Sequence, residues 1–110
     1  MTTTVTYVQI RNRIKKENAK LFHVVLLNDD YHSYDYVMEM LQKIFYFTTE
    51  QAYKHAVKVD FIGRTVLITC HRQEAEFSRD QIHACGSDPR IPSCQGSMSA
   101  LVEPAADTAG

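Results

Sequence analysis

The spacing of apolar residues changes along the chain, and each change predicts a different element. Residues 21–27 form a nearly continuous apolar run, interrupted only by His23, and this short run predicts a central strand. Asn28 follows it with two aspartates, which favour a turn because their side chains bond nearby backbone. Ser33 can then cap a helix that starts at Tyr34. The apolar face of that helix recurs at helical spacing through Val37, Met40, Leu41, Ile44 and Phe45.

The next stretch contains the signals of a second helix and a second strand. Thr48 can open the helix, with Gln51 at the position of a capping box, and Gly63 marks its end. The β-branched residues 65–70 predict the strand. A polar third helix is predicted from about residue 73 to 85, where the following glycine can end it.

A loop over residues 87–96, which contains two prolines, leads to a short last strand over residues 98–103 that Pro104 is expected to stop. The order is therefore β-α-α-β-α-β. We expect an α+β fold in which three helices pack on a small three-stranded antiparallel sheet.

The length of 110 residues supports one domain. We expect a flexible N-terminal extension over residues 1–20, the folded domain over residues 21–104 and a frayed tail over residues 105–110. The net charge of −1 gives no strong field, so neither a nucleic acid nor a membrane surface is an expected partner.

The cysteines and histidines do not suggest a metal site or a cofactor. The three cysteines, at positions 70, 85 and 94, are odd in number and fit no metal-binding or redox spacing, and the five histidines are scattered. No apolar run approaches the roughly 20 residues that cross a bilayer. The start of the chain lacks the features of a secretory signal, and together with free thiols this predicts the cytoplasm.

The most informative cluster is the turn after the first strand, where Asn28, Asp29 and Asp30 follow one another beside an apolar helix face. A free α-amine has a pKa of about 8, so it is mostly charged at neutral pH and offers three N–H donors to such oxygen acceptors. An adjacent apolar pocket could then bind the attached side chain. The alternative is ordinary turn chemistry, since Asn and Asp are common where a strand ends.

Three segments of the chain resemble the ClpS family of Clp protease adaptors. Residues 24–31 resemble the signature strand and turn of that family, residues 37–45 resemble the helix that follows, and residues 50–63 resemble the second helix with its terminal glycine. The resemblance covers residues 21–76 without a gap and resumes more weakly over residues 97–103.

The resemblance implies a non-enzymatic adaptor. Such a protein binds substrates that begin with Phe, Tyr, Trp or Leu and delivers them to the N-terminal domain of a ClpA- or ClpC-type AAA+ unfoldase. Asn28 and Asp30 would hold the α-amine, and Asp29 would contact the peptide backbone just beyond it. Tyr34 matches the usual gatekeeper methionine. The rest of the implied pocket is Val37, Val59, Ala56 and, through the weaker C-terminal similarity, Met98.

Three departures from the family pattern affect this implied site. Asp60 stands where the family usually has a histidine that accepts from the α-amine; aspartate can also accept, but its charge lies near Asp30. Tyr34 replaces the flexible methionine that helps to reject β-branched residues. Ala56 replaces a large methionine, which should deepen or widen the pocket. We expect bulky aromatic residues to remain the best ligands, because the extra volume must be filled.

Other features bear on partners less directly. His32 lies near the mouth of the implied pocket and could contact the ligand backbone, with a plain turn residue as the alternative. Gln73 stands where a glutamate is common, so docking to a particular unfoldase is not carried over. The extension would engage the unfoldase pore. A small domain with one shallow pocket favours a monomer.

Two other functions remain as alternatives. The first is a protein-docking module of the same fold that does not bind amino termini. The second is a small hydrolase that uses a cysteine or histidine with the aspartate pair. Because nothing in the sequence supplies an oxyanion site or an oriented nucleophile, with Cys85 and His83 too close along the chain, the hydrolase is disfavoured.

Overall fold

The computed structural model describes residues 20–105. Its elements are β1 (Phe22–Leu27), α2 (Tyr34–Phe45), α3 (Thr49–Ile62), β2 (Arg64–Cys70), α4 (Arg72–Ala84) and β3 (Ser99–Pro104). The predicted order and fold class are confirmed. The predicted extension and tail lie outside the described residues, apart from Lys20 and Ala105.

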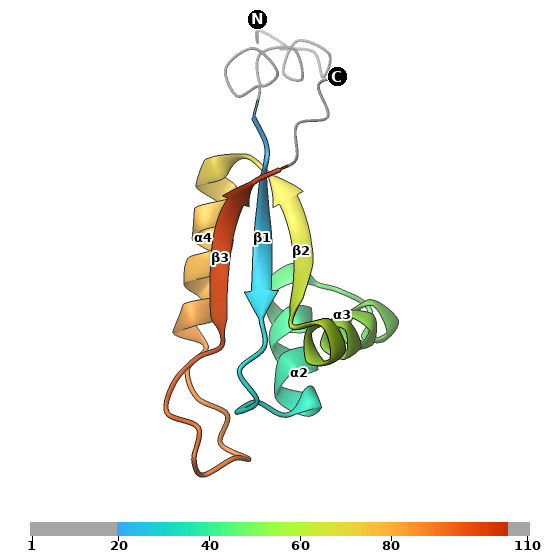
Figure 1. Ribbon diagram of the computed structural model, residues 1–110, viewed down its shortest axis with the longest axis vertical. Coiled ribbons are helices and arrows are strands. Elements are labelled where there is room, and N and C mark those ends of the chain that lie inside the picture. Colours follow the sequence, from blue (N-terminus) through green and yellow to red (C-terminus); the bar gives the residue numbers. More distant parts are fainter. Residues whose placement is uncertain (1–19, 106–110) are drawn as a thin grey trace, which may run out of the picture.

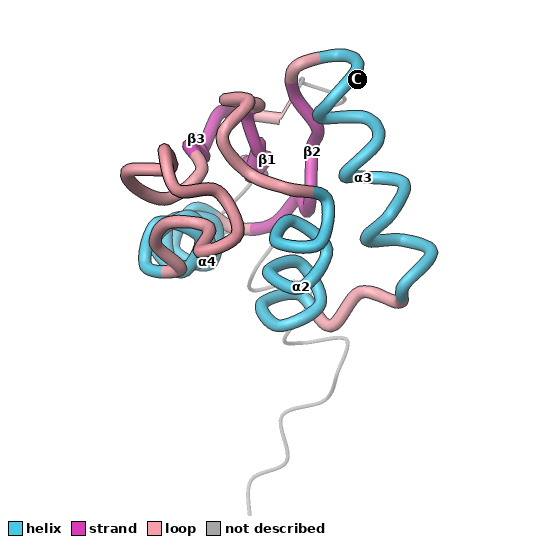
Figure 2. Tube along the Cα trace, turned by 90° about the horizontal axis from the view of Figure 1, so that it is seen from below, coloured by secondary structure: helices cyan, strands magenta, loops and turns pink. Residues whose placement is uncertain are grey.

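The sheet has the strand order β2-β1-β3, and β1 pairs antiparallel with both neighbours (Figure 1). The most apolar strand takes the central position because both of its edges are then paired and its side chains can be covered. Accordingly, Val24, Val25 and Leu26 are fully buried. Figure 2 shows α2 and α4 beneath the sheet, with α3 beyond the edge formed by β2.

The helix ends follow the predicted capping signals. The Ser33 hydroxyl accepts from the backbone N–H of Tyr36 at the start of α2. Thr48 and Gln51 form a complete capping box at the start of α3. Gly63 ends α3 with a φ of 96°, and its N–H donates to the Val59 carbonyl at 3.0 Å.

Several predicted boundaries differ from the structure by one residue; for example, β1 begins at Phe22 and β2 at Arg64. Helix α4 starts at Arg72, one residue before the prediction, and His71 precedes it without a side-chain cap. Strand β3 runs one residue later than expected, so Pro104 is its last residue and does not lie beyond it. Because β3 is an edge strand, a proline without an N–H can take its final position, where Pro104 is the partner of Phe22.

The core lies between the sheet and the helices. The predicted apolar face of α2 is buried through Val37, Met40 and Leu41, while α4 contributes Ala75 and Ile82. Among the described residues, no helix has the length and apolar character needed to cross a membrane.

We predict that Gly63→Ala destabilises the protein by about 1–2 kcal/mol, because an L-residue is strained at this positive φ although no atom lies within 4 Å of the added Cβ. The free energy of unfolding in urea measures the change. Gly96→Ala is the matched control, since its added Cβ also meets no atom within 4 Å and its backbone lies outside that positive-φ range. Equal stability of the two variants would contradict the prediction.

Candidate functional site

The turn after β1 is fixed against the end of α3. The backbone N–H of Asn28 donates to the carbonyl of Gly63 at 3.0 Å. Asp30 adopts a φ of 64°, a left-handed conformation that Asn and Asp tolerate better than most residues. The Asn28 Nδ2 donates to Asp30 Oδ1 at 3.1 Å, and the Asp30 N–H donates back to Asn28 Oδ1 at 3.3 Å. The two predicted amine ligands therefore form one reciprocally bonded unit.

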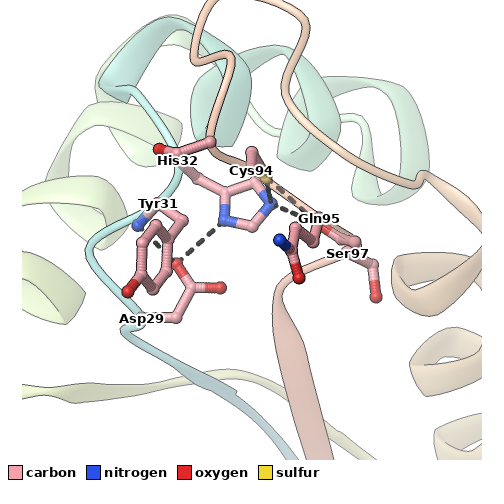
Figure 3. Close-up of a pocket in the computed structure, with 8 residues that line it drawn as sticks. Asp29, Tyr31, His32, Cys94, Gln95 and Ser97 are labelled. Atoms are coloured by element: carbon pink, nitrogen blue, oxygen red, sulfur yellow. Dashed lines mark hydrogen bonds and ion pairs between the residues drawn. The ribbon is translucent and has the colours of Figure 1, made fainter.

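The other acidic residue of the turn, Asp29, is held by contacts with two residues. Its Oδ1 accepts from the Tyr31 backbone N–H at 2.9 Å and lies 2.9 Å from His32 Nδ1 (Figure 3). The His32 side chain is only 2% exposed, whereas the Asp29 side chain keeps 26%. His32 Nε2 lies 2.9 Å from the Gly96 carbonyl. His32 therefore bridges the turn and the loop before β3.

The residues predicted to form the side-chain pocket lie together in the core cluster, which Tyr34 contacts from its edge. The other four predicted residues are only 1–4% exposed, and they are Val37, Ala56, Val59 and Met98. In this conformation little of their surface is open to a ligand.

Tyr34 connects α2 to α3 beside this cluster. Its hydroxyl donates to Asp60 Oδ2 at 2.6 Å, and its ring centroid lies 6.2 Å from that of Tyr53. Tyr53, Ala56 and Asp60 share one face of α3 because their spacing of three and four residues matches the helical period. The contacts with Tyr53 and Asp60 therefore place the Tyr34 ring along the face of α3 that also carries Ala56.

The contact also changes the chemistry of Tyr34. The hydrogen bond to Asp60, followed by burial and the carboxylate charge, raises the pKa of Tyr34 to about 12. The phenol is thus protonated at neutral pH and acts as a donor. One oxygen of Asp60 is thus engaged by the Tyr34 hydroxyl.

Sequence reasoning missed Asp88, which joins the start of α2 to the loop before β3. This carboxylate is buried and accepts from the N–H and hydroxyl of Ser33, both at 2.7 Å, and from the Arg90 N–H at 2.9 Å. Burial opposes its ionisation, but these hydrogen bonds outweigh burial and lower the pKa of Asp88. The only sequence signal was an aspartate before a proline in a loop.

A hollow of about 440 Å³ lies between the turn and this loop. It is lined by Asp29, Tyr31, His32, Ser93, Cys94, Gln95, Gly96 and Ser97. The sequence had indicated no role for Cys94. Within residues 20–105, no three His, Cys, Asp or Glu side chains are grouped so that they could hold a metal ion.

The sequence model described as "ATP-dependent Clp protease adaptor protein ClpS" matches residues 17–91. The chain belongs to the ClpS family. The ClpS adapter protein of Nautilia profundicola is 29% identical over 87 residues, which are 79% of this chain and 90% of that protein. ClpS 1 of Bradyrhizobium diazoefficiens is 36% identical over 76 residues, which are 69% of this chain and 75% of that protein.

A solved structure resembles the fold. Agrobacterium tumefaciens ClpS2 bound to L-phenylalaninamide superposes with a TM-score of 0.68 at 26% identity, covering 78% of this chain and 98% of that one. ClpS proteins are adaptors of the Clp protease system, so the chain is an adaptor-family member and the resemblance inferred from its turn and helices is confirmed.

We predict that Asp88→Asn lowers the free energy of unfolding at neutral pH by about 2–3 kcal/mol, because it removes a buried charge that accepts three hydrogen bonds. Asp80→Asn is the control, since Asp80 is exposed and paired only with the neighbouring Arg79. Urea unfolding of both variants measures the difference, and equal losses would contradict the prediction.

The same variant should reveal a pH dependence. Because the folded-state pKa of Asp88 lies below the ordinary value of 3.8, its ionised form stabilises the fold above that value. This contribution is lost as the pH falls through the lowered pKa. The stability gap between the parent protein and Asp88→Asn should therefore narrow below a pH of about 4.

Proposed function

We propose that this protein binds the free α-amine and the bulky hydrophobic first side chain of substrate proteins and delivers them to a ClpA- or ClpC-type unfoldase. The observation that carries the proposal is the bonded pair Asn28 and Asp30, held against the end of α3 beside the apolar cluster. Membership of the ClpS family supports it.

The chemistry of the turn suits a charged amine. An α-ammonium group has three N–H donors and is best held by oxygen acceptors that carry negative charge. Asn28 Oδ1 and the Asp30 carboxylate supply such acceptors, and Asp29 can accept from the first peptide N–H. The ligand of the Agrobacterium ClpS2, L-phenylalaninamide, carries an α-amine, a benzyl side chain and an amide, the three groups that this arrangement would bind.

Tyr34 and Asp60 influence which first side chain of a peptide can bind. A ligand ring that enters between α2 and α3 must displace the Tyr34 ring from its place beside Ala56. This displacement opens the hydrogen bond to Asp60, whose carboxylate can then accept from the α-amine. Only a large side chain recovers the lost contacts, so aromatic first residues should be favoured over small or β-branched ones.

Delivery to the unfoldase requires a second surface. Phe61 and Ile62 at the end of α3, and Phe77 on α4, are exposed apolar side chains of the kind that a partner protein covers. We assign the contact with the N-terminal domain of the unfoldase to the end of α3, where Phe61 and Ile62 are exposed next to each other. The adaptor itself carries out no catalysis, and a monomer suffices for both contacts.

The test is a fluorescence titration with short peptides that begin with Phe, Leu, Val or Arg, together with acetylated Phe. We expect the Phe peptide to bind best and the acetylated peptide not to bind, because acetylation removes the charge and two donors. Binding that does not distinguish the free from the acetylated peptide would favour a protein-docking module instead.

We predict that Asp30→Asn weakens binding of the Phe peptide by about tenfold or more, since a charged acceptor is lost. Asparagine is chosen because it tolerates the left-handed backbone of this position. Asp35→Asn is the matched control, because Asp35 is an exposed residue of α2 outside the turn. An unchanged affinity in Asp30→Asn would exclude Asp30 as an amine ligand.

We also predict that Tyr34→Phe strengthens binding of the Phe peptide by about threefold to tenfold, because the ring no longer has a hydrogen bond to break. The comparison is Tyr53→Phe, which alters the neighbouring ring without touching the bond to Asp60. Weaker binding in Tyr34→Phe would mean that the hydroxyl contacts the ligand directly.

A further inference from the structure

The hollow beside the amine-binding turn contains a cysteine, a histidine and an aspartate in hydrogen-bonding order. Cys94 Sγ lies 3.3 Å from His32 Nε2, and His32 Nδ1 lies 2.9 Å from Asp29 Oδ1 (Figure 3). Asp29 and His32 lie three residues apart in the turn, whereas Cys94 comes from the loop before β3, 62 residues from His32. A thiol next to an imidazole that a carboxylate orients is the arrangement that activates sulfur nucleophiles.

The partners of His32 give the thiol proton a defined destination. The carboxylate of Asp29 only accepts, so Nδ1 carries a hydrogen, and Nε2 faces both the sulfur and the Gly96 carbonyl. The Cys94 thiol also lies within donating distance of that carbonyl, at 3.3 Å. When Nε2 takes the thiol proton, the new N–H can donate to the Gly96 carbonyl at 2.9 Å. The sulfur that remains accepts from the Asp88 backbone N–H at 3.3 Å. Both products of the proton transfer are therefore hydrogen-bonded.

The backbone around the sulfur decides which reaction it suits. Acyl transfer needs N–H groups aimed at a developing oxyanion. The N–H of Cys94 already donates to the Ile91 carbonyl at 2.9 Å, and the N–H of Asp88 points at the sulfur itself. Attack on a disulfide develops charge only on sulfur and needs no such site.

The other two cysteines lie in different surroundings. Burial raises the pKa of the Cys70 thiol, with a smaller contribution from Glu74. Burial also raises the pKa of the Cys85 thiol against the opposing charge of Lys43, and its Sγ–H donates to the Gln81 carbonyl. Thiols held in the protonated form are poor nucleophiles, so the chain contains two internal references for Cys94.

We propose that Cys94 is a modification site that reacts with small-molecule disulfides, with His32 as the proton acceptor and Asp29 as the residue that orients it. The Cys94 sulfur attacks one sulfur of the disulfide, so a new S–S bond forms and the original S–S bond breaks. The departing thiolate takes the proton from His32 Nε2. Cys94 is oxidised to a mixed disulfide, the other half of the reagent leaves as a reduced thiol, and excess thiol reverses the step.

Modification of Cys94 would block peptide binding, a consequence that rests on the proposed function. Cys94 and Asp29 line the same hollow, so a bulky group on the sulfur occupies the space beside the carboxylate that receives the peptide backbone. The adaptor would then lose substrates under oxidising conditions and regain them on reduction.

The reactivity is tested without any peptide. Dipyridyl disulfide, an uncharged reagent whose released thione is coloured, is added to the folded protein, and mass spectrometry assigns the modified residue. We expect Cys94 to react about tenfold faster than Cys70 and Cys85. Cys94→Ser should remove the fast phase only. Reaction of Cys94 at or below the rates of the other two would overturn the proposal.

A second variant tests the role of His32. His32→Asn keeps an N–H donor toward Asp29 but removes Nε2, so the fast phase should slow by about fivefold or more. Asp29→Asn, which removes the charge that orients the ring, should slow it in the same direction. Thermal unfolding shows whether each variant is folded, and an undiminished rate in both folded variants would refute the assisting role.

Peptide binding supplies the last readout. Treatment with oxidised glutathione should abolish binding of the Phe peptide in the parent protein, reduction should restore it, and Cys94→Ser should be insensitive. If the parent protein binds no peptide under any condition, the proposed function fails while the thiol rates still decide the reactivity of Cys94. If the modified protein binds as well as the free one, the effect on the peptide site is refuted.

Discussion

The hydrogen bond from the Asn28 N–H to the Gly63 carbonyl holds the central strand and the end of α3 in one place. Gly63 can accept it there because its left-handed φ turns the chain out of the helix and into β2. Asp60 lies one turn earlier on the same helix and therefore ends beside Tyr34. The proposed binding site, which combines the acidic turn with the apolar cluster, depends on this junction.

On the other side of the turn, two polar residues form hydrogen bonds that connect distant segments of the chain. Asp88 connects the start of α2 to the loop, and His32 connects the turn to Gly96. Each is buried, so its hydrogen bonds replace water that it could not otherwise reach. The loop before β3 is thereby attached to the turn and to the start of α2, although it contains no helix or strand.

The fold could be predicted because its signals are local. Ser33, Thr48 and Gly63 each act within one helical turn, and the apolar spacing of β1 and α2 identifies their buried residues. The connections of the site are not local. Asp88 and Ser33 are 55 residues apart, and Cys94 and His32 are 62 apart, so no spacing rule brings them together. Tyr34, Ala56 and Asp60 were each recognised as departures, but only the structure shows that Tyr34 and Asp60 are bonded.

The hydrogen bond between Tyr34 and Asp60 makes these two positions depend on each other. A chain that exchanged only Tyr34 would leave Asp60 without its donor, and one that exchanged only Asp60 would leave a phenol beside an apolar cluster. Changing either residue alone therefore removes the partner that the other residue contacts in this chain. Residues 34 and 60 should therefore be exchanged together whenever this region of α2 and α3 is transferred between ClpS proteins.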